Sequence, residues 1–163
     1  MSRLDSFIRR MEAQRACLNA ASRLIDNLPG PILELGLGNG RTYDHLRELF
    51  PARDIYVFDR QVAAHPDCIP DDDHMFVGEV VDRLPDAAAR LGKTAALVHS
   101  DIGSGRPDTD AILFGQVIPL LNAIMRPGGL VLSDQKLPAG DWHSLSLPDG
   151  VPAERYFMYM VGA

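Results

Sequence analysis

The sequence predicts a doubly wound α/β domain, in which helices cover both faces of a mostly parallel sheet. Short apolar segments alternate with longer stretches whose apolar residues recur every three or four positions. The apolar segments are continuous, which is typical of strands buried on both faces. Strands that alternate with helices in this way form a parallel sheet. At 163 residues the chain has the length of one domain.

The helices are predicted from their apolar spacing. A first helix over 4–28 is ended by Pro29-Gly30-Pro31. The later helical stretches are 41–50, 79–91 and 107–125. We expect Pro85 to lie near a helix start or to break its helix, and Pro119 to kink or split the last one.

Five short apolar segments are the predicted parallel strands. They are 32–35, 55–58, 75–77, 95–99 and 130–132, the last preceded by a turn at 126–129. The aromatic and β-branched segment 156–161 should be an antiparallel edge strand or one half of a hairpin. A single domain, 1–163, therefore comprises an N-terminal helix (1–30), an α/β core (31–135) and a loop with a C-terminal strand (136–163).

The composition argues against several classes of function. A net charge of -6 and a pI near 5.2 provide no broad basic field for nucleic acid or anionic membranes. No apolar run approaches the roughly 18 residues of a membrane span, and no signal peptide is recognisable. Cys17 and Cys68 show neither zinc spacing nor a disulfide framework. We expect a cytoplasmic protein that acts on a small molecule and could form a homo-oligomer.

The segment 31–43, PILELGLGNGRTY, carries the strongest functional pattern. A strand runs into Gly36, Gly38 and Gly40 and then into a helix, so that backbone can come close to a ligand. A dinucleotide turn, G-x-G-x-x-G, would need glycine where Arg41 stands. The carboxylate of Glu34 would repel a pyrophosphate, and it suits a ligand with an ammonium or sulfonium group.

Every predicted strand ends in an acid or a glycine, at the edge where open parallel sheets bind ligands. These residues are Glu34, Asp59, Gly78-Glu79, Asp101 and Asp134. Asp59 lies 19 residues after Gly40, where a carboxylate reaches ribose hydroxyls. Glu79 lies 20 residues further on, where it could meet an exocyclic amine of a base. The expected ligand has a ribose, an aminated base and a positive group.

These residues resemble those of the class I S-adenosylmethionine-dependent methyltransferases, whose first motif, E/D-x-G-x-G-x-G, is matched by 34–40. The resemblance continues through Asp59, Gly78-Glu79, Asp101 and the segment 125–131, MRPGGLV, and it covers most of the chain. It implies a Rossmann-like sheet and transfer of a methyl group from S-adenosylmethionine to an acceptor that the sequence does not identify. Among smaller groups, the chain is similar to short bacterial methyltransferases of unassigned substrate.

The resemblance implies roles for individual residues. Glu34 would hold the methionine ammonium directly or through water, Asp59 would bind the ribose hydroxyls, and Glu79 would meet the adenine amine. Ser100 and Asp101 would line the methionine side near the transferred methyl. The full set of predicted cofactor residues is Glu34, Gly36, Leu37, Gly38, Asn39, Gly40, Thr42, Asp59, Arg60, Gly78, Glu79, Ser100 and Asp101.

The acceptor side is less defined. The chain has no insertion for a substrate domain, and we expect it to lack the family's usual closing pair of strands. No D/N-P-P-Y/F motif follows the fourth strand, which disfavours methylation of an amide or adenine nitrogen. Asp101 and His143 are the predicted catalytic bases, with Trp142-His143 as a lid or as a loop anchored by a buried tryptophan. His99 is expected in the core, bonded as a structural histidine.

Three alternatives remain open at this level. Asp101, Asp134 and Gln135 resemble the Asp, Asp and Asn ligands of metal-dependent catechol-type O-methyltransferases. A non-catalytic S-adenosylmethionine-binding module is the second alternative, and an NAD-dependent oxidoreductase is the third. The acidic run 71–74 is interpreted as a solvated loop, and the first-helix arginines Arg9, Arg10 and Arg15 as its solvent face. No residue is assigned to a metal.

Overall fold

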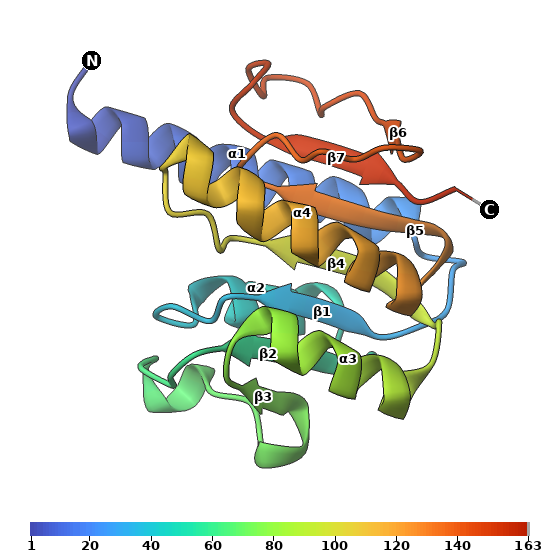
Figure 1. The fold of residues 1–163 in the computed structure, drawn as a ribbon. Coiled ribbons are helices and arrows are strands. Elements are labelled where there is room, and N and C mark those ends of the chain that lie inside the picture. Colours follow the sequence, from blue (N-terminus) through green and yellow to red (C-terminus); the bar gives the residue numbers. More distant parts are fainter. Residues whose placement is uncertain (163) are drawn as a thin grey trace.

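The computed structural model describes residues 1–162 and confirms the doubly wound α/β fold (Figure 1). Seven strands form one sheet in the order β3-β2-β1-β4-β5-β7-β6. The strands are β1 (Ile32–Leu35), β2 (Ile55–Asp59), β3 (Met75–Val77), β4 (Ala95–Ser100), β5 (Met125–Ser133), β6 (His143–Ser144) and β7 (Phe157–Met160). The helices are α1 (Arg3–Leu24), α2 (Arg41–Leu49), α3 (Val80–Leu91) and α4 (Pro107–Ile124). Pairing is parallel from β3 through β5, and β7 runs antiparallel to both of its neighbours.

Helices cover both faces of the sheet because successive strand residues point to opposite sides. Leu97 packs in a core with Leu18 of α1 and Leu46 of α2. The next residue, Val98, packs in a second core with α3 and α4, where it meets Phe114. The central strands are therefore buried on both faces, as their continuous apolar sequences predict.

The first helix ends earlier than its apolar pattern indicates. It begins with a capping box between Ser2 and Asp5 and stops at Leu24, whereas the predicted end was residue 28. The guanidinium of Arg53 donates to the carbonyls of Ile25, Leu28 and Gly30. These bonds satisfy carbonyl groups beyond the helix end and replace the last predicted turn.

Neither internal proline breaks its helix. α3 continues through Pro85, and α4 is one helix across Pro119, so the predicted break and split are wrong. Each proline costs one backbone hydrogen bond, and the burial of neighbouring side chains offsets that loss. Those neighbours include Leu84 and Ala87 in α3 and Ile118 and Leu121 in α4.

The expected turn at 126–129 is instead part of β5. The strand starts at Met125, and its register against β4 shifts between Ala95 and Leu97. The amide of Gly128 and the carbonyl of Gly129 bond to Val161, just after β7. The glycines therefore form an irregularity in a paired strand, because backbone partners are available on both sides.

The closing pair of strands that the sequence was expected to lack is present in reduced form. β7 is antiparallel as predicted, and it forms a hairpin with β6, which occupies the edge of the sheet. β6 has only two residues. Within residues 1–162, none of the helices combines the length and apolar character needed to cross a bilayer.

Candidate active site

The glycine loop after β1 shapes the site. Gly36, Gly38 and Gly40 have φ angles of 96°, 53° and 87°. A Cβ on Gly36 would lie 2.9 Å from the carbonyl oxygen of Asp101, and one on Gly40 would lie 2.5 Å from the Cβ of Cys68. A Cβ on Gly38 would meet nothing within 4 Å. Gly36 and Gly40 therefore need to be glycine because a Cβ there would collide with neighbouring residues, whereas Gly38 faces open space.

Asp59 at the end of β2 holds this loop. Its Oδ2 accepts hydrogen bonds from the amides of Leu37, at 2.8 Å, and Gly38, at 3.2 Å. Its Oδ1 accepts only a long contact from the amide of Gln61, at 3.4 Å, and so retains capacity for another donor. Sequence reasoning gave Asp59 a ligand role and missed the loop contact, which only the fold brings about.

A cavity of about 400 Å³ lies between the glycine loop, the ends of β2 and β3 and the start of α4. We call it the nucleoside cavity. It gathers seven of the predicted cofactor residues: Gly36, Gly38, Asp59, Arg60, Gly78, Glu79 and Asp101. The sequence pattern missed the wall that α4 and its preceding loop provide through Ser104, Thr109, Asp110 and Leu113. These residues carry no motif, so only their placement identifies them.

A smaller cavity of about 150 Å³, the methionyl cavity, lies on the other side of the glycine loop. Three more predicted residues line it: Leu37, Asn39 and Thr42. Its outer wall is α1, through Phe7, Arg10, Met11 and Gln14. Arg9 and Arg15 are exposed as expected, and Arg10, whose side chain is 41% exposed, also lines this cavity and pairs with Asp134 at 3.8 Å. Asp101, Gly36 and Gly38 line both cavities, which meet there.

Glu34 does not point into either cavity. Its side chain is 1% exposed, and the Nδ1–H of His99 donates to both of its oxygens, at 2.9 and 2.8 Å. Burial raises the pKa of Glu34 to about 7. A direct contact with a ligand ammonium is absent from this arrangement, and a contact through water stays a prediction.

His99 is a buried structural histidine, as expected. Its Nε2 contacts the hydroxyl of Tyr156 and lies 3.2 Å from the amide nitrogen of Gln14, which donates to Thr42. Burial lowers the pKa of His99, but the Glu34 carboxylate outweighs burial and the net pKa is raised. The network connects β1, β4, α1 and α2 beneath the methionyl cavity.

Ser100 ends β4 beside Ser133, which ends the paired strand β5, and Asp101 and Asp134 follow these two residues. The Ser100 hydroxyl is buried without a hydrogen-bond partner, as is Oδ1 of Asp134. Burial raises the pKa of Asp134 to about 6, and the neighbouring Asp101 adds to this shift. Two carboxyl groups therefore stand together where the two cavities meet.

His143 lies away from this centre, a placement that does not favour the predicted catalytic role. It pairs with Met160, which in turn pairs with Leu130, three residues before the end of β5. That offset is about 10 Å along the strand, and two strand spacings add about 10 Å across the sheet. Trp142 anchors this loop: it is 7% exposed and its Nε1 donates to Asn122 at 2.8 Å. The structure thus has the loop anchored by a buried tryptophan.

The metal-ligand alternative requires Gln135 beside the acid pair. The Gln135 amide instead lies against Gly103, where its nitrogen would be 1.8 Å from an added Cβ. The partner of Asp134 is the cation Arg10. In residues 1–162, no three His, Cys, Asp or Glu side chains are grouped to hold a metal ion. The run 71–74 is a short turn in which Asp71 bonds His74.

Comparison with known proteins identifies the class. A family model described as S-adenosyl-L-methionine methyltransferase matches residues 1–161. The crystal structure of an S-adenosyl-L-methionine methyl transferase from Silicibacter pomeroyi DSS-3 is 43% identical and superposes with a TM-score of 0.91, over 98% of this chain and 99% of that one. The chain therefore belongs to the S-adenosyl-L-methionine methyltransferase family. No curated protein matches it.

More distant structures share the fold. Human methyltransferase-like protein 13, in complex with SAH, is 12% identical with a TM-score of 0.55, over 93% of this chain and 82% of that one. A 16S rRNA (adenine(1408)-N(1))-methyltransferase variant from Catenulisporales acidiphilia, with cosubstrate SAM, is 13% identical with a TM-score of 0.52, over 90% and 91%. These two structures show the shared fold, and membership of the S-adenosyl-L-methionine methyltransferase family indicates S-adenosylmethionine as the cofactor.

The residues present fit that cofactor. The volume of about 400 Å³ lies in the range of small-molecule sites. Gly38 leaves room for a ligand, Asp59 Oδ1 has acceptor capacity, and the buried Ser100 hydroxyl lacks a partner. The paired acids favour a ligand that carries positive charge over a pyrophosphate.

Proposed function

We propose that the protein is a class I methyltransferase that transfers the methyl group of S-adenosylmethionine to a small-molecule acceptor beside Asp101. The meeting of two cavities at Asp101 carries this proposal. The larger cavity would hold the nucleoside and the smaller one the methionyl chain, and Gly36, Gly38 and Asp101, which line both, would then lie beside the sulfonium group. The acceptor then approaches over the acid pair.

Each cofactor part has a counterpart in the chain. The Oδ1 of Asp59 would accept from the ribose hydroxyls, and Glu79 would accept from the adenine amine. The glycine loop allows close approach, with Gly38 at the open position. On the methionyl side, Asn39 and Thr42 line the cavity under α1.

Catalysis rests on alignment. The bound cofactor supplies a methyl carbon on a sulfonium; the acceptor's lone pair forms the new bond as the carbon–sulfur bond breaks. Alignment of such a displacement supplies much of the acceleration. Asp101, which lines both cavities, is placed to take the proton of an acceptor that carries one. Asp134 beside it holds Arg10 of α1 in place.

A binding experiment and a turnover experiment test this proposal. Thermal unfolding with S-adenosylmethionine, S-adenosylhomocysteine, NAD and NADP should show stabilisation by the first two only. Stabilisation by NAD alone would overturn the proposal. Turnover is measured as S-adenosylhomocysteine formed with a panel of small phenols, amines and carboxylic acids.

The variant Asp101→Asn keeps the shape of the side chain and removes its basicity. We expect unchanged affinity for S-adenosylhomocysteine within about threefold and a turnover lowered by about a hundredfold. Full activity in this variant would exclude Asp101 as the base. Binding without turnover on any member of the panel would favour the non-catalytic module.

A further inference from the structure

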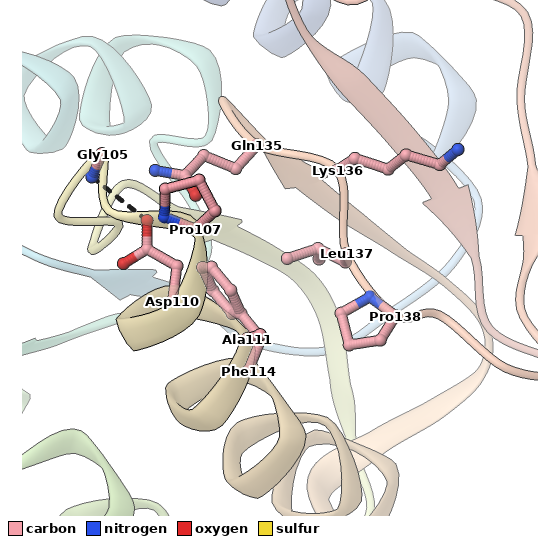
Figure 2. A pocket seen from close by; sticks show the side chains of 9 residues that line it. All are labelled: Gly105, Pro107, Asp110, Ala111, Phe114, Gln135, Lys136, Leu137 and Pro138. Atoms are coloured by element: carbon pink, nitrogen blue, oxygen red, sulfur yellow. Dashed lines mark hydrogen bonds between the residues drawn. The ribbon is translucent and has the colours of Figure 1, made fainter.

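A third cavity, of about 590 Å³, lies between the start of α4 and the loop after β5 (Figure 2). We call it the α4 cavity. Its walls are largely apolar and come from Pro107, Ala111, Phe114, Leu137 and Pro138. A concave apolar site of this volume is typical of a small-molecule site. Neither part of the cofactor needs it.

The polar end of the α4 cavity is negatively charged. Asp110 is 5% exposed and accepts from the amide and hydroxyl of Ser104, at 2.8 and 2.7 Å, and from the amide of Gly105, at 3.1 Å. Burial raises the pKa of Asp110, but the hydrogen bonds from Ser104 outweigh it and the pKa is lowered overall. The side chain of Lys136 extends away from the cavity in Figure 2.

This polar end adjoins the cofactor site. Asp110 lines both the α4 cavity and the nucleoside cavity. Gln135 lines the α4 cavity, and its amide nitrogen packs against Gly103 of the nucleoside cavity. Gln135 also follows Asp134, which leaves the sheet next to Asp101. The α4 cavity therefore adjoins the nucleoside cavity at Asp110.

We propose that the α4 cavity binds the methyl acceptor, and that this acceptor is a small, flat, apolar molecule whose nucleophile carries a hydrogen. This inference rests on the proposed function. A flat ring fits between Phe114 and the two prolines, Pro107 and Pro138. A hydroxyl or amine on that ring lies at the end nearest the cofactor, between Asp110 of the α4 cavity and Asp101 of the adjoining nucleoside cavity, and Asp101 takes its proton. A carboxylate there is repelled by Asp110.

The test uses phenol, aniline and benzoate as probes on the full chain saturated with S-adenosylhomocysteine. Saturation blocks the two cofactor cavities, so that a probe cannot bind there. Backbone amide chemical shifts are followed by NMR as each probe is titrated into the millimolar range. We expect saturable shifts at Gly105, Ala111 and Leu137 with phenol or aniline, and binding of benzoate weaker by about tenfold.

A matched pair of variants locates the binding. Ala111→Phe fills the cavity from an exposed position of α4, so folding is preserved, and melting temperature checks this. It should weaken probe binding by about tenfold or more. Ile112→Phe, at a neighbouring position that is 68% exposed and outside the cavity wall, should leave it unchanged.

The outcomes separate the two proposals. Binding of S-adenosylhomocysteine with no saturable probe binding, or with shifts clustered elsewhere, overturns the α4 cavity alone. Probe binding that survives Ala111→Phe does the same, and so does tighter binding of benzoate than of phenol and aniline. Failure of S-adenosylhomocysteine itself to bind overturns the proposed function.

Discussion

Replacing Asp59 with alanine tests how one carboxylate serves both the fold and the cofactor. Its Oδ2 accepts hydrogen bonds from two loop amides, and its Oδ1, which has only a long contact with the Gln61 amide, keeps capacity for a ligand donor. With a net value of about 0.5 to 1.5 kcal/mol for each hydrogen bond, loss of the two loop bonds should lower the free energy of unfolding by about 1 to 3 kcal/mol. A similar loss applies to the two expected ribose bonds, which corresponds to about 5- to 150-fold weaker binding of S-adenosylhomocysteine.

The loop effect and the ribose effect must be separated, because a displaced glycine loop also weakens binding. Calorimetry of adenosine and of 2′,3′-dideoxyadenosine provides the comparison. The unaltered protein should prefer adenosine, and the Asp59→Ala variant should bind both nucleosides alike. Chemical denaturation measures the stability change independently.

The result that would refute this reasoning is specific. If Asp59→Ala still prefers adenosine over 2′,3′-dideoxyadenosine as strongly as the unaltered protein does, a residue other than Asp59 binds the ribose hydroxyls. Glu79→Ala is the control. It should weaken the binding of both nucleosides equally, because both carry the adenine ring. Unchanged stability in Asp59→Ala would show that the loop does not need the carboxylate.

Three further predictions concern pH, the loop and the sheet edge. Glu34 and His99 both have a raised pKa in the folded protein, that of Glu34 moving from 4.5 to about 7. The folded state therefore binds more protons than the unfolded state over this range. The free energy of unfolding should consequently fall as the pH rises from about 4.5 past 7. Thermal melts from about pH 5 to 8 should show this slope, and Glu34→Gln should flatten it. Gly38→Ala should lower the free energy of unfolding by only about 1 kcal/mol, yet it should weaken the binding of S-adenosylhomocysteine. Gly40→Ala places a Cβ against Cys68 and should lower the melting temperature more. His143→Ala should leave cofactor affinity and turnover unchanged in titration and activity assays.

Each of these has an opposing outcome. A Glu34→Gln variant with the full pH slope would show that other groups, such as Asp134, dominate it. Equal melting temperatures for the two glycine variants would contradict the close approach of Cys68 to Gly40. A loss of turnover in His143→Ala would require the β6 edge to move toward Asp101.

The strand ends illustrate how far sequence pattern reaches. The places of Asp59, Glu79 and Asp101 at one edge of the sheet follow from short apolar strands that each close on an acid. Parallel strands bring their carboxyl ends to the same edge whatever the side chains are. The nucleoside cavity confirms that these three residues line one space.

Glu34 shows where the pattern stops. It is one residue of a four-residue strand, and the alternation of strand side chains turns it toward the α1 face. There it meets His99, which is 65 positions away in the sequence. Nothing local distinguishes a carboxylate that faces a ligand from one that pairs with a distant histidine.

The loop of Trp142 and His143 shows the same limit from the other side. Their types suggest a lid, but the register of β7 against β5 decides which end of the sheet the loop reaches. The register depends on pairing between segments far apart in the chain, which a single sequence does not display.

The sequence alone determined the α/β class, the glycine loop and the row of strand-end acids, because these depend on local periodicity and on the universal geometry of parallel sheets. The tertiary structure alone decided that α1 closes the methionyl cavity, that Asp59 holds the glycine loop, and that a third cavity adjoins the cofactor site beside α4. Those features join segments distant in sequence, and packing between such segments depends on side-chain fit over the whole core and not on any one motif.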